Sequence, residues 1–400
     1  MKKIYYGRAV YDNKEINAVI DVLRNNSLAL TDGKRVKELE NKVSHIFGKK
    51  YGLMVNSGSS ANLLALSSFN FKKGSEVITP NLTFATTVAP IYQLGLVPHF
   101  VGVEKNKFVS DVHQIEKCIN KKTVALMIPN LLGNIANWEK IHQIGKKHKL
   151  KIIEDSADTI GYKINGNNTG NYSDVVTNSF YASHIINGGG TGGIVCFNDY
   201  KLYQKAKLLR GWGRSSATFN ESESIEKRFN IKVSGIDYDA KYVFSEMGYN
   251  FLPSEISAAF ALEQLKKLKE NIKIRNRNFK QLKNFFKRYS NFFNLPEMYN
   301  GVITPWLAFP LVIKKNNLFN RKKLQIFFEK NNIQTRTIFT GNILKQPVMK
   351  KTKYKFHKDC NAIADDVMIN GILLGCHHGM TIKDVNFICK IFDKFIDKIK

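Results

Sequence analysis

A single histidine, His184, stands at the entrance of a glycine-rich run in the stretch NSFYASHIINGGGTGG, residues 178–193. Imidazole titrates near neutral pH and is the most frequent general acid or base in enzymes. The run from Gly188 to Gly193 fits the pattern G-x-G-x-x-G, which binds dinucleotides only where a strand precedes it and a helix follows it. Residues 194–197, IVCF, instead predict a strand after the run. The dinucleotide interpretation is therefore weak, and the glycines need another explanation.

A second stretch, VNSGSSAN at residues 55–62, is typical of a strand end, a turn of small residues and a helix start. Such a start binds phosphate through its free backbone N–H groups and the positive end of the helix dipole. Ordinary N-capping explains the same serines, because serine is a preferred N-cap. Both interpretations stay open at this point.

A third stretch, IIEDSAD at residues 152–158, places carboxylates at the carboxyl end of a buried strand. Ligands of open α/β sheets gather at that edge. Asp155 there could bind a metal, act as a base or pair with a ring nitrogen, whereas a solvated loop acid is plausible for Glu154. No histidine or second acidic cluster accompanies them at ligand spacing, so we expect no metal.

The elements that must position these groups alternate between short apolar strands and amphipathic helices, as in an α/β sandwich. Asn165-Gly166 predicts a hairpin turn. We divide the chain into a large domain, 1–250, whose first residues could pack on the other domain, and a bridging helix with a small α/β domain, 251–400. The predicted helices are 13–23, 33–47, 61–69, 84–93, 138–147, 253–288 (one helix or a broken pair) and one from 381; the predicted strands are 51–56, 76–79, 98–103, 124–128, 152–154, 194–197, 306–313 and 333–338.

Composition narrows the class of protein. The 400 residues are 43% hydrophobic, and no apolar run approaches the length that a bilayer requires. The N-terminus lacks the apolar segment of a signal peptide, and the five cysteines are scattered, so we expect a cytoplasmic protein that is not a membrane protein. The net charge of +28 comes from lysines spread along the chain, so we do not expect nucleic acid as a partner.

Five motifs occur in an order and spacing that resemble one family: SGSSANLLAL, PNLTFATT, IIEDSADTIG, SFYASHxxxxGG and YNFLPSEISAAFALEQLKKL. The chain resembles the nucleotide-sugar aminotransferases of the fold type I pyridoxal-phosphate (PLP) superfamily over nearly its whole length. The resemblance implies the aspartate aminotransferase fold, with a mixed seven-stranded type of sheet in an α/β/α sandwich. It also implies PLP or pyridoxamine phosphate (PMP) as the cofactor.

In that family, the position of His184 carries the lysine that holds PLP covalently. No lysine lies between Lys163 and Lys201 to replace it. The chain therefore resembles the lysine-less branch of the family, the sugar 3-dehydratases. A related branch adds a [2Fe–2S] cluster, but there is no cysteine between Cys196 and Cys360, so we expect no cluster here.

The resemblance assigns tasks to individual residues. It implies that His184 is the catalytic acid/base and that the substrate is gripped by Arg336 and Asn130, although a surface arginine explains Arg336 almost as well. For Phe84, the alternative to a contact with the cofactor ring is an ordinary aromatic side chain of the apolar core. The residues implied in cofactor binding are Gly58, Ser59 and Ser179 at the phosphate, Asn250 at the phosphate of the neighbouring subunit, Phe84 on the ring, Asp155 at the ring nitrogen and Asp158 near the ring 3-hydroxyl.

The function implied is removal of the C3 hydroxyl from a nucleotide-linked 4-keto-6-deoxy sugar, a GDP-linked mannose or heptose derivative. L-Glutamate would be the amino donor, and 2-oxoglutarate and ammonia would be released. The product would serve dideoxysugar synthesis for capsule or lipopolysaccharide, and the active sites would be shared in a homodimer. The alternatives are a nucleotide-sugar aminotransferase and a catalytically inactive homologue that binds sugar nucleotides.

Overall fold

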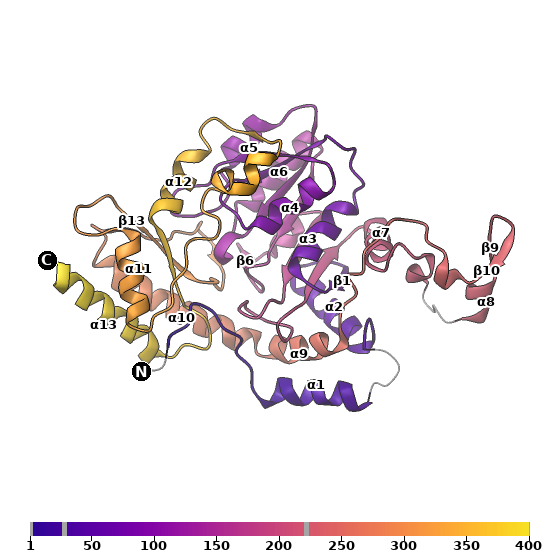
Figure 1. Ribbon diagram of the computed structural model, residues 1–400, viewed down its shortest axis with the longest axis horizontal. Coiled ribbons are helices and arrows are strands. Elements are labelled where there is room, and N and C mark those ends of the chain that lie inside the picture. Colours follow the sequence, from indigo (N-terminus) through magenta and orange to yellow (C-terminus); the bar gives the residue numbers. More distant parts are fainter. Residues whose placement is uncertain (1–2, 26–29, 220–223, 400) are drawn as a thin grey trace.

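The computed structural model describes residues 3–25, 30–219 and 224–399 of the chain. A large sheet with helices on both faces forms its centre, and a smaller sheet with helices lies beside it (Figure 1). Among the described residues, no helix combines the length and the apolar character that a membrane span requires.

The large sheet has eight strands in the order β1-β8-β7-β5-β4-β2-β3-β14. Strand β8 runs antiparallel to both of its neighbours, and the remaining pairs are parallel. Its strands are β1 (Tyr51–Val55), β2 (Glu76–Pro80), β3 (Val97–Val101), β4 (Thr123–Pro129), β5 (Lys151–Asp155), β7 (Val175–Ser179), β8 (Gly193–Phe197) and β14 (Lys355–Phe356). The α/β fold expected from the sequence is therefore confirmed, with one strand more than the seven expected because β14 joins the edge.

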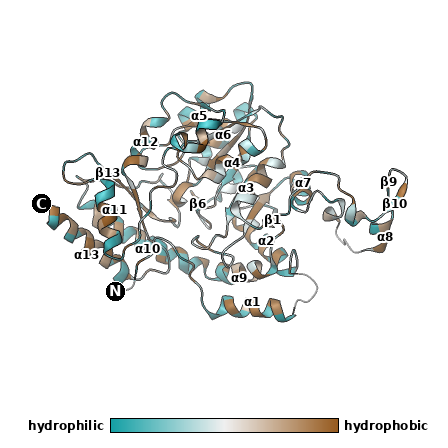
Figure 2. Ribbon diagram, in the orientation of Figure 1, coloured by the Kyte–Doolittle hydropathy of each residue, from teal (hydrophilic) through white to brown (hydrophobic). Residues whose placement is uncertain are grey.

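Alternate residues of each central strand enter the apolar cores on opposite faces of the sheet, because strand side chains alternate in direction. In β4, for example, Leu126 and Ile128 belong to one core, while Ala125 and Met127 belong to the other. The helices over this part are α2 (Lys34–Ile46), α3 (Gly58–Ser67), α4 (Ala85–Gln93), α5 (Val112–Cys118), α6 (Trp138–His148) and α7 (Tyr200–Arg210), with short 3-10 turns at Leu131–Gly133 and Thr169–Tyr172. Brown apolar and teal polar residues alternate along these helices in Figure 2, and the buried apolar ones belong to the two cores.

The C-terminal part has its own antiparallel sheet, β11-β13-β15, and its own apolar core. The predicted long helix is the broken pair, because α9 ends at Lys266 and α10 begins at Leu268. This part contains α9 (Glu255–Lys266), α10 (Leu268–Lys287), β11 (Phe293–Asn294), β12 (Val302–Ile303), β13 (Phe309–Ile313), α11 (Arg321–Lys330), α12 (Asn361–Asn370), β15 (Gly371–Leu374) and α13 (Ile382–Ile399), with 3-10 turns at Ile343–Lys345 and Pro347–Lys351.

The N-terminal segment packs on the C-terminal part. Ile4 forms a parallel bridge with Ile333, and α1 (Asn13–Asn25) lies along α9 (Figure 1). The strand predicted at residues 333–338 is wrong, because only isolated bridges form at Ile333 and Arg336. The Asn165-Gly166 turn is confirmed: both residues have positive φ, and the turn follows β6 (Lys163–Ile164), which pairs with β12.

An arm made of residues 211–219 and 224–250 projects from the sheet (Figure 1). It contains 3-10 turns at Ser215–Thr218 and Ala240–Tyr242, helix α8 (Ile225–Phe229) and the hairpin β9 (Ile231–Val233) and β10 (Ile236–Tyr238). Large apolar side chains are exposed on it, among them Ile225, Phe244 and Met247.

Candidate active site

A cavity of about 630 Å³ opens at the carboxyl ends of the central strands. This size lies within the range of small-molecule sites. The stretches 57–59, 155–158 and 179–192, which are far apart in the sequence, all line it. The structure therefore brings together six of the residues expected to bind cofactor, with His184: Gly58, Ser59, Phe84, Asp155, Asp158 and Ser179.

Asp155 ends β5 and is 5% exposed. Its Oδ2 accepts hydrogen bonds from Asn62 Nδ2 and Thr87 Oγ1, both at 2.8 Å, and its Oδ1 accepts one from the Ala157 N–H at 3.1 Å. Burial raises the pKa of Asp155, while these three donors oppose the rise. A fixed carboxylate with one acceptor position left is suited to a cationic N–H donor in the cavity.

The turn before α3 forms a cradle of free donors. Ser57 is the N-cap, and its hydroxyl accepts from the Ser60 N–H at 3.1 Å, so the capping interpretation of this motif is correct. Within the described chain, the N–H groups of Gly58 and Ser59 have no acceptor. A Cβ on Gly58 would lie 2.5 Å from the Cβ of Ser179, so only glycine lets the two segments approach this closely.

The glycine run closes the same cradle from the other side. Gly192 bonds to the carbonyl of Asn56 and has a φ of +120°, a conformation that glycine adopts readily. A Cβ on Gly193 would lie 2.5 Å from the Ser57 backbone. Because β8 begins at Gly193, the last glycine of the run, the glycines serve a tight turn into a strand, and no helix follows that could receive a dinucleotide.

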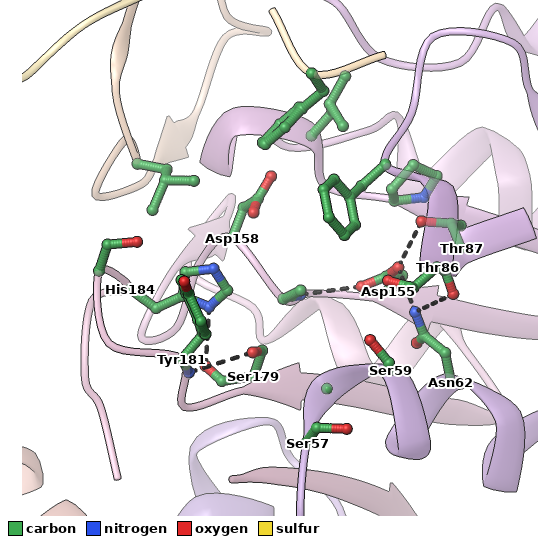
Figure 3. Close-up of a pocket in the computed structure, with 18 of the residues that line it drawn as sticks. Ser57, Ser59, Asn62, Thr86, Thr87, Asp155, Asp158, Ser179, Tyr181 and His184 are labelled. Carbon is green, nitrogen blue, oxygen red and sulfur yellow. Dashed lines mark hydrogen bonds between the residues drawn. The ribbon is translucent and has the colours of Figure 1, made fainter. Parts of the chain in front are cut away.

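His184 faces Asp155 across the cavity, and Asp158 lies on the histidine side (Figure 3). The imidazole Nδ1 lies 3.2 Å from the carbonyl oxygen of Ser179. Burial lowers the pKa of His184 to about 4; the Ser179 carbonyl opposes this shift and Arg275 adds to it. The ring is therefore neutral at pH 7. A proton on Nδ1 satisfies the carbonyl and leaves Nε2 as a free base.

Asp158, like Asp155, has a carboxyl group with a raised pKa. Its Oδ2 accepts from the Leu132 N–H at 2.8 Å. Burial raises its pKa to about 7; the Leu132 N–H opposes the rise, and the charge of Asp155 adds to it. Tyr6, which the sequence analysis did not single out, also lines the cavity, and burial raises its pKa. Two groups able to hold protons therefore face the cavity near His184.

Asn130 lines the cavity, but its amide is fully engaged by the protein. Its Oδ1 accepts from the Trp138 ring and the Ala136 N–H, and its Nδ2 donates to Glu154 and to Ser156. These bonds give the Asn130 side chain a role in building the cavity wall. Glu154 is wholly buried and accepts from Asn130 and Thr169, so the loop-acid interpretation of Glu154 is wrong.

Three expected residues differ in how close they lie to the cavity. Phe84 is half exposed in the cavity and packs edge-on against Phe339, so it is not a core aromatic. Arg336 is not among the residues that line the cavity, but its guanidinium lies 5.9 Å from the ring centre of Tyr6, which does line it. Asn250 is exposed at the base of the arm and is not among the residues that line the cavity of its own chain.

A pyridoxal-type cofactor fits these residues. The free N–H groups of Gly58 and Ser59 suit a phosphate, and the buried Asp155 suits a protonated ring nitrogen on the same side of the cavity. Among the described residues, no group of histidine, cysteine and acidic side chains is arranged to hold a metal ion.

The chain belongs to the DegT/DnrJ/EryC1/StrS aminotransferase family, whose model matches residues 10–393. A curated relative named dTDP-4-dehydro-2,6-dideoxy-D-glucose 3-dehydratase, from Saccharopolyspora spinosa, is 32% identical over 98% of this chain and 86% of its own length.

Two solved structures are similar over nearly their whole length. The E. coli GDP-4-keto-6-deoxy-D-mannose-3-dehydratase with bound hydrated PLP matches with a TM-score of 0.88 and 28% identity, covering 98% of this chain and 99% of that one. A GDP-4-keto-6-deoxymannose-3-dehydratase with a trapped PLP–glutamate geminal diamine matches with a TM-score of 0.85 and 27% identity, covering 97% and 99%. The fold and the cofactor class expected from the sequence are confirmed.

Proposed function

We propose that the protein is a PLP/PMP-dependent 3-dehydratase that removes the C3 hydroxyl of a nucleotide-linked 4-keto-6-deoxy sugar. L-Glutamate is the amino donor, and 2-oxoglutarate and ammonia are the co-products. The names of the similar 3-dehydratases support this reaction, and the glutamate adduct in one of them supports the donor. The product would enter dideoxysugar synthesis for a surface polysaccharide.

The observation that carries the proposal is the neutral His184 opposite Asp155. No lysine is among the described residues that line the cavity, so nothing there can hold the cofactor covalently as an aminotransferase does. A neutral imidazole with a free Nε2 can instead accept a proton directly. The same geometry disfavours a transaminase, which would need an amine at this position.

The cofactor, when bound, supplies an amino group and an electron-withdrawing ring. Asp155 keeps a proton on the ring nitrogen, Gly58, Ser59 and Ser179 hold the phosphate, and Phe84 covers the ring. His184 Nε2 removes a proton at the reacting centre. We place Asp158 near the ring hydroxyl, where a pKa of about 7 lets this carboxyl hold or release a proton in the same pH range.

The cavity and its surroundings favour an anionic sugar nucleotide. The cavity of about 630 Å³ has room for a sugar beside a cofactor, and Arg336, next to the cavity residue Tyr6, can pair with a phosphate. The similar proteins are named for dTDP-linked and GDP-linked sugars, and we propose the GDP-linked hexose or heptose as the substrate.

A homodimer with shared sites belongs to the proposal. Asn250 lies outside the cavity of its own chain, and the arm beside it exposes large apolar side chains that a second copy could cover. We keep the division at residue 250, at the end of this arm, as a proposed domain boundary.

Mixing two inactive variants tests the shared site. Randomly mixed His184→Ala and Asn250→Ala subunits should recover about a quarter of the normal activity, because half of the dimers then contain one intact site. Mixtures that stay inactive, although heterodimers form, would place Asn250 in the site of its own chain.

The substrate proposal is tested by the mass of the product. GDP-linked, dTDP-linked and CDP-linked 4-keto-6-deoxy hexoses, and the GDP-linked heptose, would each be incubated with the protein, PLP and L-glutamate. We expect loss of the C3 oxygen from a GDP-linked sugar. Gain of an amino group would establish an aminotransferase, and no product from any sugar would support an inactive sugar-nucleotide-binding homologue.

A further inference from the structure

Behind His184 lies a buried arginine that the proposed chemistry does not yet use. Arg275 of α10 is 0% exposed. Its Nη2 donates to the backbone carbonyl of His184 at 3.3 Å, and its Nη1 donates to the carbonyls of Leu307 at 3.1 Å and Trp306 at 3.2 Å. Two of these acceptors, His184 and Leu307, belong to residues of the cavity wall. The guanidinium is therefore fastened directly to the wall that carries the candidate base.

The charge of Arg275 is not cancelled by its neighbours. Within the described chain it makes no ion pair with a carboxylate, and its Nε donates to Nδ1 of His378 at 3.2 Å. An imidazole nitrogen that accepts a hydrogen bond is unprotonated, and burial lowers the pKa of His378 to about 2, so this partner is neutral. Burial lowers the pKa of Arg275 only to about 10, which leaves it charged at neutral pH.

Keeping a cation in this position has a cost. Burying a charge without a carboxylate costs several kcal/mol unless hydrogen bonds compensate. Here four N–H donors meet four neutral acceptors, which come from three separate segments of the chain. A structural link between the segments needs no positive charge, so the charge itself calls for a function.

We propose that Arg275 is a positioning residue for His184: it fixes the histidine loop at the cavity wall and keeps a permanent positive charge behind the imidazole. This inference rests on the proposed role of His184 as a base. The nearby cation disfavours a second positive charge on the ring, so His184 stays neutral and ready to accept a proton. Lysine could supply the charge, but it could not reach all four acceptors.

Other titratable groups also face His184 and could influence its charge. They come from the N-terminal segment, from the end of β5 and the chain after it, and from the histidine's own loop, with two more next to the guanidinium: Tyr6, Asp155, Asp158, Tyr181, Cys376 and His378. Of the cations in the described chain, Arg275 is the one whose charge contributes to the pKa shift of His184.

The test follows His184 directly, by NMR titration of the labelled full-length protein without added cofactor. The signal is assigned with a His184→Gln variant. Arg275→Met should raise the pKa of His184, because the nearby cation that opposes protonation of the ring is gone. Arg277→Met is the matched control. Arg277 lies on the same helix and also donates to a backbone carbonyl, that of Met380, but it is exposed. Its removal should leave the titration of His184 unchanged.

Arg275→Lys separates charge from position. This variant should keep the low pKa of His184 but lower kcat roughly tenfold or more, with KM for the sugar unchanged, because the imidazole is no longer held in place. An unchanged His184 titration in folded Arg275→Met would overturn the electrostatic part. Normal kcat in Arg275→Lys would overturn the positioning part. If Arg275→Met does not fold, kcat and the His184 titration of Arg275→Lys are the test. Absence of dehydration by the unmodified protein would reject the proposed function and leave the titration result standing.

Discussion

Replacing Asp155 with asparagine tests the electronic core of the site. Three of the four acceptor positions of this carboxylate are taken by Asn62, Thr87 and the Ala157 N–H, which leaves one position for the cavity. A hydrogen bond that involves a charged group contributes about 1.5–3 kcal/mol. Losing one corresponds to a roughly tenfold to 150-fold weaker Kd for PLP. The asparagine side chain also has an N–H₂ group, which would face one of the donors that now bond to the carboxylate.

The assay is equilibrium dialysis of PLP at neutral pH, with unfolding curves to confirm that Asp155→Asn is folded. Thr87→Val is the matched control, because it removes one donor to the same carboxylate and keeps the charge. Its Kd should rise less than about tenfold. If Asp155→Asn binds PLP as tightly as the unmodified protein does, the carboxylate does not face the ring nitrogen and our assignment of the site is wrong.

Three further predictions concern the other groups of the site. His184→Lys should abolish dehydration and form a PLP adduct that borohydride reduction fixes to the protein; continued turnover without an adduct would contradict the base role. Gly58→Ala, whose Cβ would lie 2.5 Å from the Ser179 Cβ, should cost about 1–3 kcal/mol of unfolding free energy. Gly211→Ala, whose nearest contact would be 3.4 Å, should cost little, and equal losses in urea denaturation would refute the packing argument. Because burial raises the pKa of Asp158 to about 7, its stabilising contribution is full at low pH and is lost as pH rises. Asp158→Asn should therefore flatten the decline in stability between about pH 4 and pH 7, and an unchanged pH profile of thermal unfolding would contradict this.

Local patterns in the sequence predicted six of the eight strands of the large sheet, but they predicted neither β14 nor the central strand β7, which carries Ser179. Short apolar strands such as β4 and β5 are buried on both sides, so their composition alone identifies them. The Asn165-Gly166 turn also follows from adjacent residues, whereas the sequence left open whether α9 and α10 are one helix or two. The candidate phosphate cradle could be predicted because its glycines and serines are consecutive.

Contacts between distant segments could not be predicted in this way. The stretch at residues 333–338, IQTRTI, is rich in β-branched residues like a strand, but it makes only single bridges, to Ile4 and to Leu373. Asn130 stands at a strand end like a ligand-binding residue, yet partners such as Glu154 and Trp138 occupy its amide. Tyr6 reaches the cavity from far along the chain. Hydrophobic periodicity reports local burial and carries no information on which segments meet.

The central claim is a 3-dehydratase in which a neutral histidine replaces the covalent lysine, and the fate of nitrogen tests it most directly. The protein would be incubated with PLP, L-glutamate and GDP-4-keto-6-deoxy-mannose, and free ammonia, 2-oxoglutarate and amino sugar would be quantified together. We predict equal amounts of ammonia and 2-oxoglutarate, with a 3-deoxy-4-keto sugar as the product. Nitrogen retained on the sugar, with no free ammonia, would contradict the claim and identify an aminotransferase that works without the lysine.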